Sequence, residues 1–173
     1  MSTGRPADTE FAPFYARYVA LVPEDDVAAA LAAQVEEFRR LGTGVSPARE
    51  SFRYAPDKWS VRQVVGHLTD GERVFGHRLF CFSRGEQAPL PAFDENAYVA
   101  QSAYDRVPLA DLVDELVTVR LSNLAVLSRL DAETWGRVGT ASGKPVTVRA
   151  LAYVMAGHPR HHLAILRERY GLS

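Results

Sequence analysis

The sequence predicts an all-α protein, an antiparallel four-helix bundle, and three observations support this prediction. Four long segments repeat apolar residues at helical spacing, no segment alternates as a strand would, and loops with proline or glycine separate the four. The chain has 173 residues, of which 47% are hydrophobic. This length suits one domain with a sizeable core, so we expect a single domain over residues 1–173, with the bundle core at about residues 25–170.

The first predicted helix covers residues 25–41 and the second covers residues 60–84. Acidic residues open the first helix, and Gly42 suits the position that follows a helix C-terminus. The second helix begins at Ser60, with Gln63 three residues later in a capping-box pattern. The apolar face of the first helix consists of Val27, Leu31, Val35, Phe38 and Leu41.

The third predicted helix begins at Pro108, since proline is favoured at the first helical position. Its stripe has one polar member, Asn123, among Leu109, Leu112, Leu116, Val119, Leu127 and Leu130. The fourth helix covers residues 147–170. We expect one bent helix through Pro159, because the apolar stripe continues on both sides of a proline that cannot donate to the carbonyl of Met155.

Two further segments complete the predicted architecture. Residues 11–22 are rich in aromatic residues and form an N-terminal arm that should pack across the bundle. Residues 84–107 form a long connection between the second and third helices, which fits a crossover rather than a tight hairpin. Pro89 and Pro91 disfavour a helix in that connection.

Composition and charge exclude several classes of protein. The formal net charge of −1 argues against a dedicated nucleic-acid-binding protein, and no apolar run approaches the roughly 18 residues of a membrane span. Cys81 is the only cysteine, so the chain has no internal disulfide and no cysteine-based zinc motif, and we interpret it as a small buried apolar residue. The polar residues 1–10 lack the apolar region of a signal peptide, which predicts a cytoplasmic protein.

Three of the five histidines are candidate ligands of one metal ion. His158 and His162 are four residues apart on the fourth predicted helix, so their side chains point about 40° apart on its core-facing side. This spacing lets two imidazoles reach one ion. His67 borders the apolar stripe of the second helix and is the best candidate for the third ligand, with Gly71 one turn later leaving room for a ligand or a substrate.

Each candidate also has a purely structural interpretation. A histidine near an apolar face is more often a satisfied core or boundary residue than a ligand. His77 lies on another side of the second predicted helix than His67, and we interpret it as a surface residue. His161 points away from the core face of the fourth predicted helix. The metalloprotease pattern H-E-x-x-H fails here, because Pro159 stands where the glutamate would be.

Two polar residues near these histidines have alternative roles. Asp70 is one turn from His67 and is either a solvated carboxylate or an outer partner that accepts a hydrogen bond from a ligating imidazole. Asn123 either lines the same cleft or is a buried amide bonded to a neighbouring backbone.

Two segments resemble the DinB/YfiT-like superfamily. They are K-W-S-V-R-Q-V-V-G-H-L-T-D-G-E-R-V-F at residues 58–75 and R-A-L-A-Y-V-M-A-G-H-P-R-H-H-L-A-I-L-R-E-R-Y at residues 149–170. F-A-P-F-Y-A-R-Y and P-L-P-A-F-D-E-N-A-Y-V, at residues 11–18 and 89–99, are similar to its second subgroup, so the resemblance covers nearly the whole chain. The chain departs from the family pattern at Pro159, where members usually carry another residue, often glutamate.

The resemblance implies a four-helix bundle in up-down-down-up order, often a homodimer. It implies a divalent metal, commonly zinc or nickel, on His67, His158 and His162. Three protein ligands leave an open position, so the expected function is an enzyme that activates a small thiol or water against a small electrophilic substrate. The thiol version is a thiol S-transferase of detoxification or stress response with a low-molecular-weight thiol cosubstrate, and the water version is a metal-dependent hydrolase. The alternative is a metal-binding stress protein without catalysis.

Overall fold

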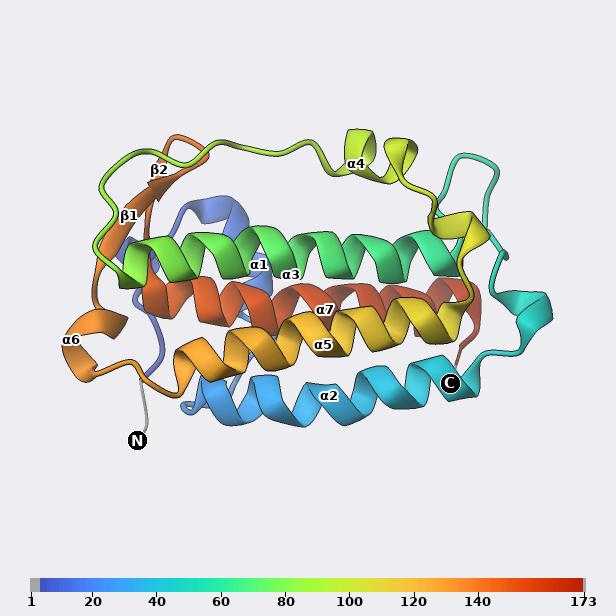
Figure 1. Ribbon diagram of the computed structural model, residues 1–173, viewed down its shortest axis with the longest axis horizontal. Helices are drawn as coiled ribbons and strands as arrows, with labels where there is room; N and C mark the ends of the chain where they lie inside the picture. Colours follow the sequence, from blue (N-terminus) through green and yellow to red (C-terminus); the bar gives the residue numbers. More distant parts are fainter. Residues whose placement is uncertain (1–3, 173) are drawn as a thin grey trace.

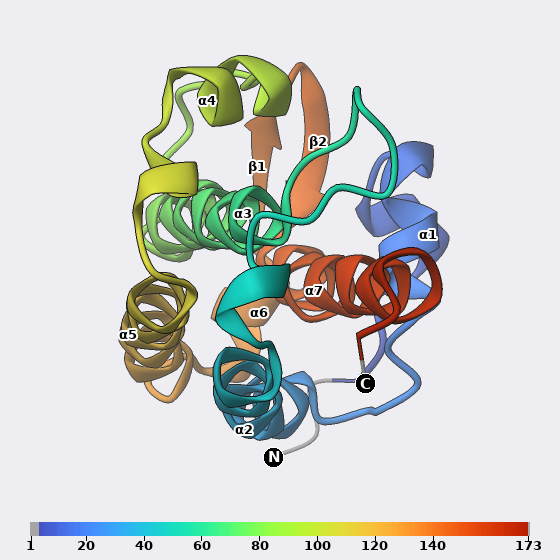
Figure 2. The same cartoon turned by 90° about the vertical axis from the view of Figure 1, so that its right-hand side faces the viewer.

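A computed structural model describes residues 4–172 and contains the four long helices of a bundle (Figures 1 and 2). These are α2 (Val27–Gly44), α3 (Val61–Ser83), α5 (Leu109–Leu127) and α7 (Val148–Tyr170). Helices α2 and α7 run in one direction and α3 and α5 run in the other, so the order is up-down-down-up (Figure 1). The predicted fold class is confirmed. Helix α3 packs against α5 and α7, and α2 closes the bundle against the same two helices (Figure 2).

The capping box predicted at Ser60 forms at the start of α3, and both ends of α7 are capped as well. The Oγ of Ser60 accepts a hydrogen bond from the backbone N–H of Gln63, and the Oε1 of Gln63 accepts one from the backbone N–H of Ser60, each at 3.1 Å. The Oγ1 of Thr147 caps α7 by accepting from the N–H of Ala150 at 3.0 Å. Gly171 ends α7 in the left-handed region at φ 63°.

Two predicted helix boundaries were wrong. Helix α2 continues past Gly42 to Gly44, so Gly42 lies inside the helix, where α5 packs closely against it. A Cβ at Gly42 would lie 3.2 Å from Cγ1 of Val113. Helix α5 begins at Leu109, one residue later than predicted, and ends at Leu127.

A β-hairpin between α5 and α7 was missed by the sequence analysis. Strands β1 (Val138–Ala141) and β2 (Lys144–Thr147) pair antiparallel, and the tight turn between them has positive φ at both central residues, 53° at Ser142 and 72° at Gly143. Each strand has only four residues and contains a glycine or a proline, which weakens the strand pattern. Leu90 of the long connection forms a bridge with Ala141 of the hairpin.

The remaining elements are short. The N-terminal arm contains three-residue 3-10 helices and α1 (Ala16–Val19), which packs on α7 as expected (Figure 2). The connection from α3 to α5 crosses back along the bundle (Figure 1) and contains α4 (Glu95–Gln101) and the 3-10 helix η4 (Tyr104–Arg106). The helix-breaking prolines of this connection precede α4. The other elements are η1 (Asp8–Glu10), η2 (Pro13–Tyr15), η3 (Pro47–Arg49) and α6 (Ala132–Trp135).

A buried ion pair joins the bundle helices in the core. The guanidinium of Arg120 on α5 donates from Nε and Nη2 to the two carboxylate oxygens of Glu72 on α3, at 2.7 and 2.9 Å. Its Nη1 donates to the Oε1 of Gln34 on α2 at 2.7 Å and to the carbonyl of Leu31 at 3.1 Å. Arg120 and Gln34 are fully buried, and Glu72 is nearly so. These buried polar groups therefore have hydrogen-bond partners, and the buried positive charge has a counter-charge, as burial requires.

The same network supports α7 at its proline. Pro159 has no N–H for the carbonyl of Met155, and the Nη2 of Arg120 donates to that carbonyl instead, at 3.1 Å. The Nε2 of Gln34 donates to the next carbonyl, that of Ala156, at 2.7 Å. Helix α7 therefore continues through Pro159, as predicted, while the bend stays a prediction.

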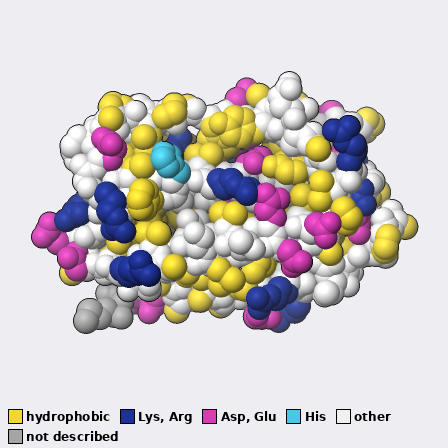
Figure 3. Space-filling view, in the orientation of Figure 1, with side chains coloured by type: hydrophobic (Ala, Val, Ile, Leu, Met, Phe, Trp, Pro, Cys, Tyr) yellow, Lys and Arg dark blue, Asp and Glu magenta, His cyan; other side chains and the backbone are white. Residues whose placement is uncertain are grey.

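The surface in Figure 3 carries basic and acidic side chains intermixed, without a large area of one sign. Within residues 4–172, no helix is both long and apolar enough to cross a membrane.

Candidate metal centre

His67 of α3 and His158 and His162 of α7 form one cluster in the bundle. One ring nitrogen from each lies within 4.8 Å of the others, and the Nε2 atoms of His67 and His158 are 2.9 Å apart. The three ring centroids are 4.7–4.8 Å from one another. His67 and His158 are buried, and His162 is partly buried. The structure thus brings together the three histidines singled out from the sequence.

The cluster favours neutral imidazoles. Burial lowers the pKa of His67 to about 4. Burial, followed by the neighbouring imidazoles and the Arg17 guanidinium, holds the pKa values of His158 and His162 well below the usual histidine range. A neutral imidazole offers a lone pair to a metal. Near pH 7, a metal ion would therefore displace few protons from these three rings when it binds.

Gly71 makes room for a histidine rather than for a substrate. A Cβ at Gly71 would lie 2.8 Å from Cε1 of His158, closer than side-chain carbons approach. The expected space beside His67 is therefore filled by the second imidazole. Helices α3 and α7 need a glycine at this position to let the two rings meet.

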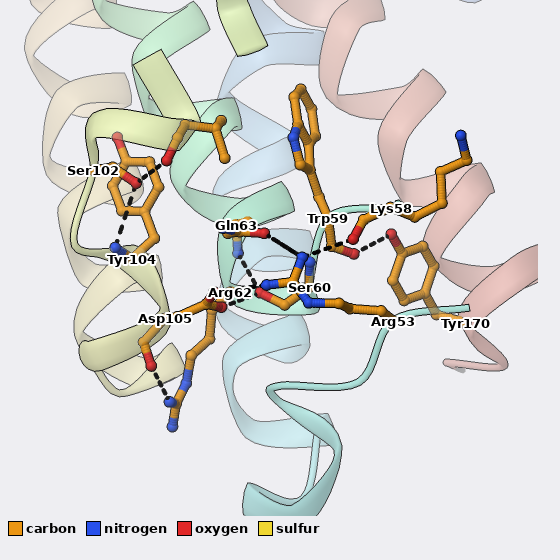
Figure 4. A network of polar contacts seen from close by, with 11 residues as sticks. Arg53, Lys58, Trp59, Ser60, Arg62, Gln63, Ser102, Tyr104, Asp105 and Tyr170 are labelled. Atoms are coloured by element: carbon orange, nitrogen blue, oxygen red, sulfur yellow. Dashed lines mark hydrogen bonds and ion pairs between the residues drawn. The ribbon is translucent and has the colours of Figure 1, made fainter. Parts of the chain in front are cut away.

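The loop before α3 covers one side of His67. The Trp59 ring lies 4.7 Å from the His67 ring, centroid to centroid. The carbonyl of Trp59 accepts a hydrogen bond from the Tyr170 hydroxyl at 2.7 Å, and Arg53 links the same loop to Gln63 (Figure 4). These contacts fix the loop against the start of α3 and the end of α7, so the indole has a defined position over the cluster.

Asp70 does not bond a histidine, contrary to one of its two expected roles. Its Oδ1 accepts a hydrogen bond from the hydroxyl of Tyr104 at 2.6 Å, and burial raises its pKa. Its Oδ2 and the Nδ1 of His67 are the two buried side-chain atoms without a hydrogen-bond partner within residues 4–172. Neither atom is therefore satisfied by the other. The carboxylate is also not fully solvated, because its Oδ2 is buried, although the residue as a whole is partly exposed.

Asn123 belongs to the core network and not to the histidine cluster. Its Nδ2 donates to the backbone carbonyl of Glu72 at 3.2 Å and to the Glu72 carboxylate at 3.0 Å. This supports the alternative in which Asn123 is an amide bonded to a neighbouring backbone, although the residue is only partly buried.

The other histidines and the cysteine lie outside the cluster. His77 is exposed, as expected, and its ring nitrogens lie 3.6 and 3.8 Å from the Sγ of Cys81. Cys81 is only partly buried, so the expectation of a buried residue was wrong. His161 is half-buried, and its ring meets the edges of Tyr18 and His162.

Cavities flank the cluster on two sides. His162, Trp59 and Tyr170 belong to the lining of a cavity of about 230 Å³. His158 and Arg78 belong to the lining of a second cavity, of about 180 Å³. Two of the three clustered histidines therefore each line a cavity. Sequence reasoning missed the cavity-lining residues, since they come from segments with no shared motif.

Comparisons with known proteins agree with this fold. The sequence profile of the DinB superfamily matches residues 30–166. The chain belongs to the DinB superfamily. A protein of Oceanobacillus iheyensis named as a candidate metal-dependent hydrolase is 26% identical over 140 residues, which cover 78% of this chain and 80% of that protein.

Two solved structures share the fold of this DinB-superfamily protein. YfiT from Bacillus subtilis, described as a candidate metal-dependent hydrolase with an unusual four-helix bundle topology, superposes with a TM-score of 0.71 at 19% identity, over 88% of this chain and 91% of YfiT. A mycothiol-dependent maleylpyruvate isomerase superposes with a TM-score of 0.65 at 14% identity, over 89% of this chain and 63% of the isomerase. At these identities the likeness concerns the fold.

The three histidines suit a divalent metal ion. Imidazole nitrogens bind zinc at about 2.0–2.1 Å, and the 2.9 Å between the Nε2 atoms of His67 and His158 lets one ion reach both. Imidazole is also a suitable ligand for nickel. If the Nε2 of His67 bound the ion, its Nδ1 would carry the proton, and this atom has no hydrogen-bond partner among the described residues.

Proposed function

We propose that His67, His158 and His162 hold one divalent ion, zinc or nickel, in a metal-dependent enzyme that acts on a small electrophilic substrate. The proposal rests on one observation, the cluster of three shielded imidazoles whose donor atoms lie within 4.8 Å of one another. The names of the Oceanobacillus relative and of YfiT support a hydrolase, and the mycothiol dependence of the isomerase supports a thiol-dependent reaction. We therefore propose that water or a low-molecular-weight thiol is the attacking molecule.

A divalent ion on three protein ligands keeps an open position and lowers the pKa of a water or thiol that binds there. The chain supplies the surroundings. His67 and His158 come from facing helices, and the Trp59 ring limits access of solvent to His67. The two flanking cavities, one at His162 and one at His158, offer separate places for the attacking molecule and the electrophile.

Metal titration tests the site. The metal-free protein should bind one equivalent of Zn²⁺ or Ni²⁺ by calorimetry, and Co²⁺ should give the visible absorption of nitrogen coordination. Replacing His158 by alanine should weaken binding by at least 100-fold, because one of three ligands is lost. His77→Ala is the matched control, since His77 is exposed on α3, and it should bind as the native protein does. Equal binding by all three proteins would refute the site.

A screen of the metal-loaded protein tests the activity. It combines several low-molecular-weight thiols, or water alone, with model electrophiles such as activated esters and epoxides. Turnover that His158→Ala abolishes and His77→Ala retains supports the enzyme. Metal binding without any turnover across the screen would favour the metal-binding stress protein instead.

A further inference from the structure

Two arginines in the core differ in what balances their charge. Arg120 pairs with Glu72, as described above. Arg78 on α3 is 2% exposed, yet within residues 4–172 it forms no ion pair. A buried cation without a counter-charge is unfavourable unless something compensates for its desolvation. The rings of Phe75 and Phe93, with centroids 6.0 and 5.9 Å from the guanidinium carbon, offer cation–π contacts, but no carboxylate of the described residues neutralises the charge. The position of Arg78 therefore points to an anion that binds from outside the chain.

The hydrogen bonds of Arg78 leave part of its guanidinium free. Its Nη1 donates to the hydroxyl of Tyr15 at 3.2 Å, and its Nη2 donates to the carbonyl of Pro91 at 2.6 Å and to the Oγ of Ser142 at 3.0 Å. All three acceptors are neutral. A guanidinium has five N–H groups, so two of them have no partner among the described residues.

Arg78 is held at the meeting point of four segments. Tyr15 comes from the N-terminal arm, Pro91 from the long connection and Ser142 from the hairpin turn, while Arg78 itself belongs to α3. The hairpin and the connection are joined by a backbone hydrogen bond from the N–H of Ser142 to the carbonyl of Leu90 at 3.1 Å. The guanidinium is thus positioned before any ligand arrives, which lowers the entropy cost of binding.

Arg78 shares a cavity of about 180 Å³ with His158. Arg17 and Glu95 also line it, so two cations face one carboxylate and the cavity carries a positive balance. The other lining side chains are mostly aromatic: Phe14, Tyr15, Tyr18, Phe75 and Phe93. Such walls suit an apolar or unsaturated molecule, while a planar guanidinium suits a carboxylate or phosphate through paired hydrogen bonds.

We propose that this cavity binds a small organic acid, with its oxyanion group on Arg78 and its apolar part against the aromatic rings. Because His158 lines the same cavity, the bound acid reaches towards the histidine cluster. The assignment of this acid as the electrophilic substrate rests on the proposed function, whereas the binding of the anion does not. Arg78 is a binding residue in this proposal, and Arg17 adds to the positive potential of the cavity.

The experiment measures anion binding by the metal-free full chain, so that it is independent of the metal site. The probes are benzoate, phenyl phosphate and the neutral analogue benzamide, titrated by calorimetry. Benzoate or phenyl phosphate should bind one per chain and at least about tenfold more tightly than benzamide, because only the anions can form charge-assisted hydrogen bonds with the guanidinium. A preference for one anion identifies the substrate class as carboxylate or phosphate. Equal binding of all three probes, or no binding, would overturn the proposal.

Variants locate the anion. Arg78→Gln should lower the affinity for the preferred anion roughly 10- to 100-fold while leaving benzamide unaffected. Arg84→Gln is the matched control, because Arg84 is an exposed arginine at the end of the same helix, and it should keep the affinity. Unchanged anion affinity in Arg78→Gln would overturn the proposal.

A second measurement keeps the proposal testable if Arg78→Gln does not fold. The side-chain ¹⁵N resonances of Arg78 in the native protein should shift when the anion is added and should not shift with benzamide. An anion that binds without moving these resonances would overturn the proposal. Metal binding without anion binding would overturn this inference and leave the proposed function standing. Anion binding without metal binding would overturn the proposed function and leave the anion site standing.

Discussion

Replacing Arg120 by methionine should lower the free energy of unfolding by about 3–5 kcal/mol. The substitution removes five hydrogen bonds, two of them to Glu72, and leaves that carboxylate 2% exposed without a counter-charge. Removing one partner of a buried ion pair typically costs this much. For a chain of this size, the loss corresponds to a fall in melting temperature of roughly 6–20 °C.

The matched control is Arg73→Met. Arg73 and Glu115 join the same two helices, α3 and α5, but both side chains are about half exposed. Exposed ion pairs contribute at most about 1 kcal/mol, so this variant should melt close to the native temperature. The assay is urea unfolding followed by circular dichroism, with thermal melts as a second measure. Equal losses in Arg120→Met and Arg73→Met would refute the argument that burial makes the difference.

A double-mutant cycle isolates the support that Arg120 gives to α7. Pro159→Ala restores an N–H donor for the carbonyl of Met155, which Arg120 otherwise satisfies. In the Pro159→Ala background, Arg120→Met should cost about 1–2 kcal/mol less than in the native chain, since one buried carbonyl no longer loses its partner. Additive effects would show that the arginine does not compensate for the proline. Alanine is preferred to glutamate because Pro159 is buried.

Three further predictions concern the histidine cluster. Gly71→Ala should weaken metal binding at least tenfold in a calorimetric titration, because its methyl group would displace the His158 ring, whereas Gly44→Ala has nothing within 4 Å of its Cβ and should bind normally. Asp70→Asn should change metal affinity less than about threefold, since its carboxylate bonds a tyrosine, and a 10- to 100-fold loss would instead indicate an outer partner of a ligating imidazole. The metal-free protein should lose stability as the pH falls from about 6.5 towards about 4, because the pKa of His67 is lowered to about 4 and the unfolded chain binds the proton first. For this histidine, the loss in the free energy of unfolding reaches about 3 kcal/mol. The free energies of unfolding of the native chain and of His67→Gln, measured with urea, should therefore converge at low pH.

The sequence alone determined the long helices and the three histidines of the cluster. Helical periodicity and local caps act within a few residues, so the capping box at Ser60 marked the start of α3 correctly. The spacing of His158 and His162 fixed their shared face for the same reason. His67 was chosen from its place beside the apolar stripe of the second helix, and the resemblance to a family then supported it. The order of the helices came with that resemblance, because periodicity does not say which helices are neighbours.

Only the tertiary structure decided the roles of residues whose partners are distant in the chain. The sequence analysis interpreted Gly42 as the residue after a helix end. In the structure it lies inside α2, where the absence of a Cβ lets Val113 of α5 pack closely. Asp70 had two possible roles, a solvated carboxylate or an outer partner of a ligating imidazole, and it bonds Tyr104, 34 residues later. Arg120 and Arg78 carry no signal of burial in the sequence, since a charged residue on a helix is ordinarily solvated. Their environments depend on four or more segments meeting at one point, and no local pattern encodes that meeting.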